Sequence, residues 1–596
     1  MSPFRFMLPY LKKYKWRYFW GMIILFVVDI ANVLIPRITG IIFDGLNDGT
    51  FDLHDVVFYL GIFLASGAVI AIGRFLWRYC FHGASRSVER DLRNDMFKHL
   101  EELDVDFYHE NKTGDLMSHF TSDLEAIRMA MGMAIVAAFD ATIMAIMVLT
   151  QMIFFVDPFM TLITMIPMLM ILGGMFYYGK AVAPRFADRQ QAVSDLMDYT
   201  QESFSGVRVV KAFVRERAQY KEFLRYNANA RKKNLRLARL QSVVIPILEM
   251  LIGISMLITI LFGGYLVLNQ SVSLGKFVSY NQYIGMLVWP MIACGDSIQM
   301  ISKGLASVRR IQGIFETKSE LTAPGVNGKN LESAVIPDIK GDIVFHHLSY
   351  THKGNAEETL TDINFHITPG MTMAIVGRTG SGKSTLVDLL LHLFNVEPGM
   401  ITIDGVDIND IPLKDLREHI AYVPQDDFLF SDSLKANIAF GVQDANLKAI
   451  QRAAQNACVH DNIMEFPEGY DTVVGERGVT LSGGQKQRSA IARAWLMDAP
   501  ILIMDDALSA VDTDTEEQIL SNLRATRKGK TTILIAHRIS TIQNADCILV
   551  LEEGRVAELG NHAELMEQKG IYHDLFEMQQ LEAAAGEKRS ALINEE

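Results

Sequence analysis

The chain has 596 residues, of which 49% are hydrophobic, and a formal net charge of −13. This length exceeds what one hydrophobic core ordinarily holds, so at least two domains are expected. The acidic balance excludes nucleic acid as a main partner, because binding to phosphates requires a basic surface. The four cysteines lie far apart, and their spacing fits neither a zinc site nor a disulfide framework.

Six apolar segments are each long enough to cross a membrane, which takes about 20 mostly apolar residues. The segments are Tyr18–Pro36, Val56–Arg78, Ala134–Val156, Phe159–Tyr178, Val243–Leu268 and Phe277–Cys294. The first has no small-residue cleavage site after it, so we expect it to remain as an anchor rather than to be removed as a signal peptide. Only Asp157-Pro158 separates the third and fourth segments, which predicts a tight helical hairpin.

The distribution of Lys and Arg predicts the orientation of these segments. Basic residues precede the first segment at positions 5, 12, 13, 15 and 17, whereas the loop after it is acidic. Basic flanks stay in the cytoplasm, so the N-terminus is expected inside the cell. The long polar connections 79–133 and 179–242 are then cytoplasmic as well, and both have a helical rather than a strand-like pattern. We therefore expect a multi-pass protein of the cell membrane.

Several ionisable residues lie within or near the apolar segments. They are Asp29, Arg74, Arg78, Asp140, Glu249 and Asp296. Charged side chains inside a membrane are costly and serve as functional hypotheses by default. Acids that face a cavity would favour cationic amphipathic compounds, and the many Met and Phe residues would suit an adaptable lining. The alternative is that Met and Phe only pack against each other or face lipid.

Composition divides the chain after the last apolar segment. We assign residues 1–317 to a transmembrane domain, 318–340 to a linker with Pro and Gly, 341–580 to a second domain, and 581–596 to a polar C-terminal tail. In the second domain short apolar strands alternate with helices, which is typical of an α/β fold with a largely parallel sheet. The expected fold class is an α-helical six-span transmembrane domain joined to an α/β domain.

A glycine-rich loop follows the expected strand Met371–Val376 and precedes an apolar helix. It matches the pattern GxxxxGK[ST] and consists of Gly377, Arg378, Thr379, Gly380, Ser381, Gly382, Lys383, Ser384 and Thr385. In this strand–loop–helix context backbone amides approach phosphates, Lys383 reaches the β- and γ-phosphates, and Ser384 holds Mg²⁺. Asp505, at the end of the apolar run Ile501–Met504, is expected to hold Mg²⁺ as well. These residues predict a P-loop NTPase domain that binds ATP and Mg²⁺.

A second segment with anion-binding character begins another helix. It consists of Leu481, Ser482, Gly483, Gly484 and Gln485. Serine and glycines at a helix start leave backbone amides available to an anion. Because the P-loop already supplies one phosphate cradle, the second segment indicates a phosphate held by a second molecule. An ordinary linker turn is the alternative.

The ordered set of motifs resembles the ABC transporters. It comprises Tyr350, the P-loop, Gln425, the segment 481–485, the strand ending in Asp505, the segment 509–512 and His537. In the membrane half, residues 112–116 and 206–213 look like segments of ABC exporters. Residues 472–478 are similar to an exporter-specific loop that touches the transmembrane helices. The resemblance spans nearly all of the chain and indicates one half of an ABC exporter.

The resemblance implies a dimer that sandwiches two ATP molecules and exports by alternating access. Tyr350 would stack on adenine, Gln425 would sense Mg²⁺ and the membrane domain, and His537 would contact the γ-phosphate. The segment 481–485 would close over the ATP of the partner chain. The expected partners are membrane lipid and small amphipathic substrates, with multidrug export ahead of lipid or peptide export. An ATP-gated channel or regulatory subunit is a further alternative, whereas a soluble ATPase acting on DNA would have no need for six spans.

One position departs from the pattern of the family. Where the family has a glutamate that polarises the attacking water, this chain has Asp506, which is one methylene shorter. The pattern resembles the subunit of a heterodimer that contributes a weakly hydrolysing site while its segment 481–485 completes the competent site of the partner. We therefore expect a second, different half-transporter as the partner, with a slow homodimer as the alternative.

Overall fold

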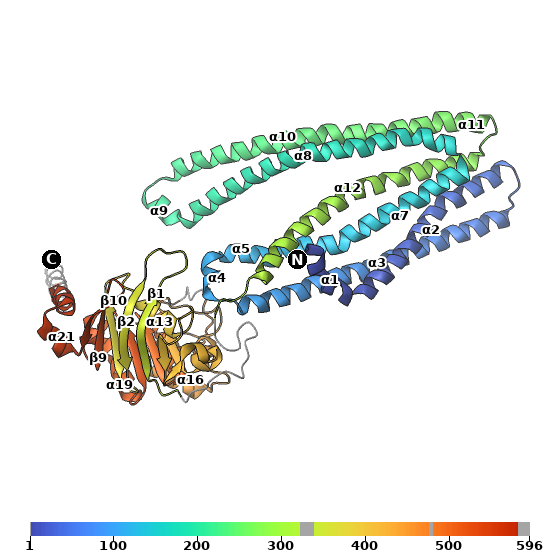
Figure 1. Ribbon diagram of the computed structural model, residues 1–596. Helices are drawn as coiled ribbons and strands as arrows, with labels where there is room; N and C mark the ends of the chain where they lie inside the picture. The colour runs from blue at the N-terminus through green and yellow to red at the C-terminus, as the bar shows by residue number, and fades with distance from the viewer. Residues whose placement is uncertain (1, 322–338, 476–480, 582–596) are drawn as a thin grey trace. The chain divides into compact units, whose positions relative to one another are not determined.

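The computed structural model describes residues 2–321, 339–475 and 481–581, which form two compact units (Figure 1). The first unit comprises Met1–Glu101 and Lys112–Thr317, and the second comprises Glu102–Asn111 and Lys318–Glu596. The short segment Glu102–Asn111 therefore belongs with the second unit, although it lies within the range assigned to the transmembrane domain from sequence. Residues 322–338 of the expected linker and 582–596 of the expected tail lie outside the described residues.

The described part of the first unit consists of long helices and their connections, without strands. Its α-helices are α1 (Pro3–Lys13), α2 (Lys15–Asn47), α3 (Leu53–Glu101), α5 (Thr113–Ser118), α6 (Leu124–Met129), α7 (Ile135–Gln151), α8 (Pro158–Ser205), α9 (Val207–Ala212), α10 (Glu216–Ile258), α11 (Gly264–Leu268) and α12 (Leu274–Glu316). Four π-helical turns continue these helices: η1 (His119–Asp123), η2 (Ala130–Ala134), η3 (Met152–Val156) and η4 (Thr259–Gly263). The connections 79–133 and 179–242 are helical for most of their length.

Among the described residues, five helices are long and apolar enough to cross a membrane. They are Lys15–Asn47, Leu53–Glu101, Thr113–Val156, Glu216–Leu268 and Leu274–Glu316. These five contain five of the six expected segments. The remaining segment falls in α8, which begins with the apolar stretch Pro158–Ile171. The number of six spans therefore stays a prediction.

The helices of the first unit pack along their lengths. Helix α12 lies against both α2 and α7, whereas α8 and α10 run side by side as a long pair (Figure 1). The contact between α2 and α12 is very close, because a Cβ atom added to Gly275 would lie 1.9 Å from the carbonyl oxygen of Gly40. Tyr283 is fully buried at this contact and donates its hydroxyl to the carbonyl of Val33 at 3.1 Å. Small residues and buried hydroxyls of this kind are typical of helix contacts in membranes.

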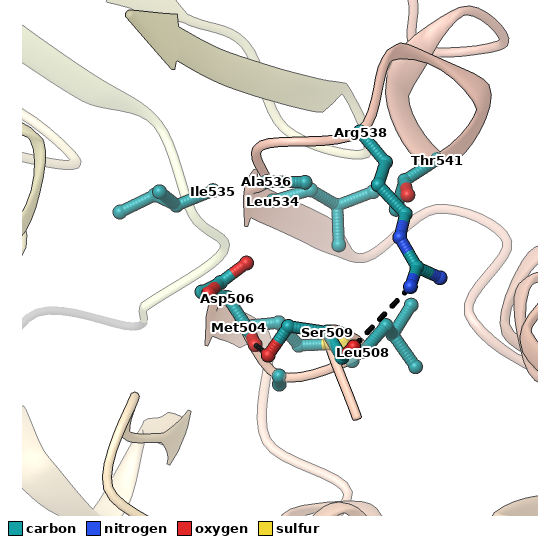
Figure 2. A pocket seen from close by; sticks show the side chains of 10 residues that line it. Met504, Asp506, Leu508, Ser509, Leu534, Ile535, Ala536, Arg538 and Thr541 are labelled. Carbon is teal, nitrogen blue, oxygen red and sulfur yellow. Dashed lines mark hydrogen bonds between the residues drawn. The ribbon is translucent and has the colours of Figure 1, made fainter. Parts of the chain in front are cut away.

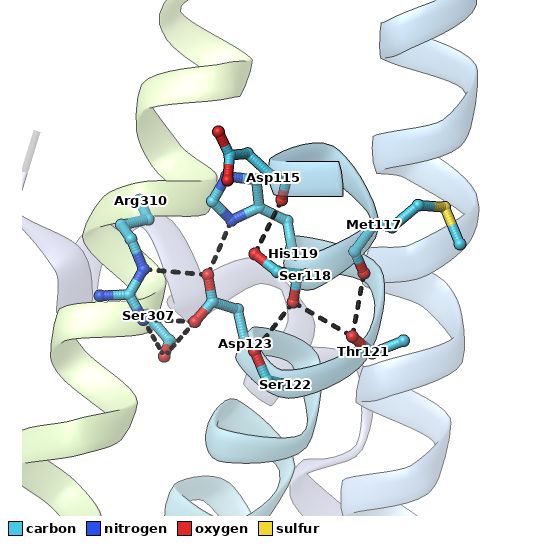
Figure 3. A network of polar contacts seen from close by, with 9 residues as sticks. All are labelled: Asp115, Met117, Ser118, His119, Thr121, Ser122, Asp123, Ser307 and Arg310. Atoms are coloured by element: carbon cyan, nitrogen blue, oxygen red, sulfur yellow. Dashed lines mark hydrogen bonds and ion pairs between the residues drawn. The ribbon is translucent and has the colours of Figure 1, made fainter. Parts of the chain in front are cut away.

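A polar network joins the turn η1 to the C-terminal part of α12 (Figure 3). The carboxylate of Asp123, which is buried, accepts from Ser307 at 2.8 Å and from Arg310 Nε at 3.0 Å. The ring of His119 lies 2.7 Å from the same carboxylate. Because three side chains from two segments meet at one buried carboxylate, the network fixes the register of η1 against α12.

The second unit contains two sheets. Its strands are β1 (Ile343–Tyr350), β2 (Leu360–Ile367), β3 (Thr372–Gly377), β4 (Ile401–Ile403), β5 (Val406–Asp407), β6 (Ile420–Val423), β7 (Ile501–Asp505), β8 (Thr531–Ile535), β9 (Cys547–Glu552) and β10 (Arg555–Gly560). The six-stranded sheet has the order β10-β9-β3-β8-β7-β6 and is parallel except for β10. The prediction of a largely parallel sheet is confirmed for these strands.

A second, antiparallel sheet of order β2-β1-β4-β5 was not predicted from the sequence. Buried and exposed residues alternate along β2, as expected for a sheet with one face on the core. In the parallel sheet, by contrast, every residue of β7 and of β8 is buried. Since β3, β7 and β8 are neighbours and parallel, their carboxyl ends meet at one edge, which is where ligands bind in sheets of this kind.

Helices complete the second unit. They are α4 (Val105–Glu110), α13 (Lys383–Leu390), α14 (Leu413–Glu418), α15 (Leu434–Ile438), α16 (Leu447–Asn456), α17 (His460–Met464), α18 (Gly483–Met497), α19 (Thr513–Thr526), α20 (Ile539–Ile542) and α21 (His562–Gln568). Asp104 caps α4 and also accepts from the backbone amide of Glu320 at 2.7 Å. This bond joins α4 to a segment distant in the sequence.

Candidate nucleotide-binding site

The P-loop connects the end of β3 to the start of α13. Gly380 and Gly382 have φ angles of +83° and +96°, which favour glycine strongly. A Cβ atom on Gly377 would lie 2.2 Å from the carbonyl oxygen of Leu551, so this position also requires glycine. The three glycines therefore allow the chain to turn tightly and expose backbone amides at the start of α13.

Lys383 bends back over the loop that contains it. Its ammonium group donates to the carbonyls of Gly377 and Arg378, both at 2.9 Å. Burial lowers the pKa of Lys383, and the carboxylates of Asp505 and Asp506 oppose this shift. A buried ammonium held in the loop and facing two carboxylates is suited to contact phosphate oxygens.

A further observation indicates that the loop can hold a phosphate group. The hydroxyl of Ser381 is buried, yet it has no hydrogen-bond partner among the described residues. Buried hydroxyls are ordinarily paired, so an isolated one in a glycine-rich loop indicates a place for an oxygen-rich ligand. Arg378 and Thr379 are exposed at the loop, and Thr385 accepts or donates a hydrogen bond at 3.2 Å to His352.

Two of the residues expected to hold Mg²⁺ lie where the P-loop meets the end of β7. Ser384 forms a side-chain hydrogen bond with the buried Asp505. Burial raises the pKa of Asp505, whereas the bond from Ser384 and the charges of Lys383 and His537 lower it. A hydroxyl and a carboxylate are oxygen ligands of the kind that Mg²⁺ prefers. Gln425, the third expected ligand, follows β6 and is exposed.

Asp506 follows Asp505 in an unusual backbone conformation. Its φ angle is +47°, in the left-handed region, which Asp tolerates better than most residues. Its amide donates to the carbonyl of Ile535 at 2.9 Å, so β8 holds the residue in place. The half-buried side chain lines a small pocket together with Ser509 and Arg538 (Figure 2).

One ion pair and several hydrogen bonds hold the segment that contains His537. Arg538 donates to Glu516 at 2.9 Å and to the carbonyl of Ser509 at 3.3 Å, the latter drawn in Figure 2. Gln579 accepts from the amide of Ile539 at 2.9 Å and donates to the carbonyl of His537 at 2.6 Å. The His537 side chain itself is exposed. Its backbone is therefore held while its ring is left accessible.

Tyr350 ends β1 beside the P-loop and belongs to an aromatic cluster. Its ring lies 5.0 Å from that of His352 and 6.0 Å from that of Phe394. Phe394 in turn lies 6.4 Å from the ring of His109 in α4. His352, Phe394 and His109 were not predicted from sequence, because their proximity depends on the fold. The cluster presents aromatic faces near the P-loop and connects them with α4.

The segment 481–485 forms the start of α18. Ser482 accepts from the amide of Gln485 at 3.3 Å, and the Gln485 side chain accepts from the Ser482 amide at 3.0 Å. This reciprocal cap shows why serine and glutamine stand three positions apart. Ser482 and Gly483 are exposed. The capped helix start is accessible at the surface of this chain.

Gln487, two residues further along α18, was not predicted as a functional residue. Its exposed fraction is 3%, and it donates to the carbonyl of Asp506 at 3.4 Å and to Ser509 at 3.1 Å. Its side-chain oxygen accepts from the amide of Ala510 at 2.8 Å. One buried amide therefore connects the helix of the segment 481–485 with the loop containing Asp506.

Asp427 is a second residue that sequence reasoning missed. Its pKa is raised to about 7, mainly by burial and also by the charges of Asp426 and Asp506, while the charge of Lys486 opposes this shift. Its Oδ1 atom is buried without a hydrogen-bond partner among the described residues. A protonatable carboxyl group thus lies within electrostatic range of Asp506.

The exporter-specific segment is described only in part. Residues 472–475 are described, and the amide of Leu434 donates to the carbonyl of Thr472 at 3.0 Å. Residues 476–478 lie outside the described residues. Of the acids in the membrane half, Asp29 is buried, Asp140 is half-buried, and Glu249 and Asp296 are exposed.

Both units match families of known proteins. The family described as "ABC transporter transmembrane region" matches residues 18–291, and the family described as "ABC transporter" matches residues 360–509. The chain is similar to a solved structure titled "Structure of a bacterial Atm1-family ABC exporter with ATP bound". The TM-score is 0.78 and the identity 26%, over 96% of this chain and 98% of the other.

Curated relatives match over most of the chain. The chain is 38% identical to the probable multidrug resistance ABC transporter ATP-binding/permease protein YheI of Bacillus subtilis, over 96% of this chain and 97% of the relative. It is 36% identical to the multidrug resistance-like ATP-binding protein MdlA of Escherichia coli, over 96% and 95%. It is 35% identical to an ATP-dependent lipid A-core flippase of Syntrophus aciditrophicus, over 84% and 81%.

Proposed function

The chain belongs to the ABC transporters, as an ATPase of exporter type in a cell membrane, and we propose that it exports small amphipathic compounds, cationic ones among them. Two of the relatives have names that refer to multidrug resistance. The acids at positions 29 and 140 in the membrane half provide negative charge that would suit a cation. Export of a lipid is the second candidate, since one relative is named as a lipid A-core flippase.

The arrangement at the edge of the parallel sheet carries the proposal for ATP use. Lys383 and the buried Ser381 would hold the phosphates, and Tyr350 would stack on the adenine ring. Ser384, Asp505 and Gln425 would hold Mg²⁺, which when bound neutralises phosphate charge. His537 would contact the γ-phosphate, and Asp506 would orient the attacking water. We also propose that α8 is the sixth span, because an apolar run begins it at Pro158–Ile171.

Coupling to transport would follow alternating access in a dimer. Family members of exporter type work as dimers, in which segment 481–485 of one chain closes over ATP bound by the other. The exposed start of α18 supports this role for Ser482 and Gly483. ATP binding would favour the closed state of the dimer and hydrolysis would reverse it, which shifts the populations of two states of the membrane helices.

The aspartate at position 506 favours a heterodimer. Its carboxylate is one methylene shorter than the glutamate of the family, and a displacement of about 1 Å costs on the order of 10²-fold in rate. A partner with glutamate at the corresponding position would supply the hydrolysing site. Affinity purification of the tagged chain from its native membranes is expected to recover such a half-transporter. Recovery of only this chain would favour the homodimer instead.

Transport in vesicles tests the function. The chain, with any half-transporter that copurifies, is reconstituted in lipid vesicles, and ATP is added outside with a fluorescent lipophilic cation or a fluorescent phospholipid. We expect ATP-dependent accumulation of the cation against its gradient, and no accumulation in the Lys383→Ala variant. Movement of the phospholipid alone would support lipid export. Flow of the cation only down its gradient would identify an ATP-gated channel.

A further inference from the structure

A buried acid without a donor lies in the membrane half. Asp29 in α2 has an exposed fraction of 1%. Neither of its carboxylate oxygens accepts a hydrogen bond from a donor among the described residues. An ionised carboxylate in such a place costs several kcal/mol, by an order-of-magnitude estimate, unless a donor or a cation compensates it. Asp29 therefore requires either a proton or a positively charged partner.

The neighbour of Asp29 is another acid. The Asp29 carboxyl group lies within hydrogen-bonding reach of that of Asp140 in α7, where two ionised carboxylates would repel each other. Of the described ionisable groups on the packed helices α2, α3, α7 and α12, only Asp140 acts on Asp29. Ionised carboxylates are acceptors only, so a hydrogen bond between two of them requires a proton on one. The contact itself thus implies a shared proton.

The two acids differ in their surroundings. Asp140 is half-buried, and its Oδ2 atom accepts from the indole N–H of Trp289 in α12 at 3.2 Å. Trp289 has an exposed fraction of 58%. Because a donor and partial exposure stabilise the ionised form, Asp140 is the better place for the charge and Asp29 for the proton. This is the arrangement of acid pairs in which two carboxyl groups share one proton.

We propose that Asp29 and Asp140 form a proton-binding site that holds one proton at neutral pH and presents a single negative charge beside Trp289. The site unites α2, α7 and α12, which pack against one another within the first unit. The proton is bound to Asp29, and the resulting hydroxyl donates a hydrogen bond to the carboxylate of Asp140. The inference does not depend on the identity of the exported compound.

The site has a consequence for ligands that rests on the proposed function. One carboxylate beside an exposed indole matches a monovalent organic cation in charge, and the indole face adds a cation–π contact. Binding of a cation at this place is therefore expected to depend on the negative charge of the pair.

Infrared spectroscopy of the full-length protein in lipid tests the shared proton directly, because a protonated carboxyl group and a carboxylate absorb at different frequencies. The spectrum of Asp29→Asn is subtracted from that of the wild type at pH 7. We expect a positive protonated-carboxyl band that moves in D₂O. Asp296→Asn, which changes an exposed acid of α12, serves as the control and should give no such band.

A second variant keeps the test decisive if Asp29→Asn fails to fold. Asp140→Asn replaces the hydrogen-bond partner, so the Asp29 band is expected to shift or disappear. The proposal is overturned if the band is absent from the wild type, survives Asp29→Asn, or is unchanged by Asp140→Asn. Because no transported compound is used, these outcomes are independent of whether the chain exports cations. Weaker binding of a lipophilic cation to Asp140→Asn than to the wild type separately tests the consequence.

Discussion

At the scale of single residues, Asp506 is the residue that we propose limits the ATPase rate of this chain. Its backbone is held by the bond from its amide to Ile535, so the position of the carboxylate depends on the length of the side chain. We expect Asp506→Glu to raise the ATPase rate of the purified chain on the order of 10²-fold, since it restores the missing methylene. Activity with Lys383→Ala in both backgrounds provides the baseline.

The same substitution is expected to lower stability slightly. Glutamate is less tolerant than aspartate of the φ angle of +47° at this position, which costs about 1 kcal/mol. Asp506→Glu should therefore unfold at a lower temperature than the wild type. A wild-type chain that already hydrolyses ATP briskly and is unaffected by the substitution would contradict the weak-site interpretation.

Asp427 predicts a dependence of stability on pH. Its folded-state pKa of about 7 lies above the value of an ordinary aspartate, mainly because of burial. The folded chain therefore keeps a proton that the unfolded chain has released, so stability falls as the pH rises towards about 7. We expect Asp427→Asn to remove part of this fall and to raise the melting temperature at pH 8 relative to the wild type.

The exposed Asp444 offers a matched control for this measurement. Asp444→Asn removes one charge from a loop of the same unit without removing a buried carboxyl group. Its melting temperature should follow that of the wild type between pH 5 and pH 8. If Asp427→Asn also follows the wild type over this range, Asp427 does not hold the proton.

At the scale of elements, the network around Asp123 connects η1 with α12 (Figure 3). Asp123→Asn removes the charge that Arg310 and Ser307 contact, and hydrogen bonds to charged groups contribute about 1.5–3 kcal/mol. Because Arg310 is half exposed, we expect the free energy of unfolding to fall by an amount near the lower end of this range. Thermal unfolding in detergent measures this loss of stability, with Glu125→Gln in α6 as an exposed control. Equal melting temperatures for both variants would show that the network contributes little.

Gln487 links two elements of the nucleotide-binding unit. Gln487→Leu keeps the volume but removes one donor from the carbonyl of Asp506, which retains its bond from Ser509, and removes the acceptor of the Ala510 amide. Each hydrogen bond lost in this way costs about 0.5–1.5 kcal/mol. We expect a lower melting temperature and a lower ATPase rate in the Asp506→Glu background. Gln518→Leu on the exposed face of α19 should change neither.

The sequence predicted the elements that have local signatures and missed those that depend on packing. The P-loop could be found because Gly380, Gly382 and Lys383 each satisfy a local requirement of backbone or charge. Asp427 and Gln487 carry no such signature, since their importance comes from burial beside Asp506. The antiparallel sheet was missed because its short strands β4 and β5 resemble loops in the sequence.

At the scale of the whole molecule, the boundary between the units is not a single point in the sequence. Residues 102–111 form part of the second unit, although the chain enters and leaves them from the first. The hydrogen bond from the Glu320 amide to Asp104 and the contact of His109 with Phe394 explain this membership. Composition could not reveal it, because a short amphipathic helix has the same pattern in either unit.

The proposed dimer requires that the P-loop and the segment 481–485 act together from different chains. In the Asp506→Glu background, Lys383→Ala removes the phosphate contact and Ser482→Arg blocks the helix start, so each variant alone should be inactive. A dimer that contains one chain of each kind has one intact site of two. If half of the dimers in an equal mixture are mixed, about a quarter of the parent ATPase activity should return.

Coexpression of the two variants and measurement of ATP hydrolysis test this arrangement. Ser521→Arg, which places the same side chain on the exposed face of α19, is the control and should remain active by itself. Recovered ATPase activity in the mixture would mean that the P-loop and the segment 481–485 of one site come from different chains, because neither variant has both motifs intact within one chain. An inactive mixture, with both variants folded and able to copurify, would place the motifs of each site on the same chain and exclude the sandwich.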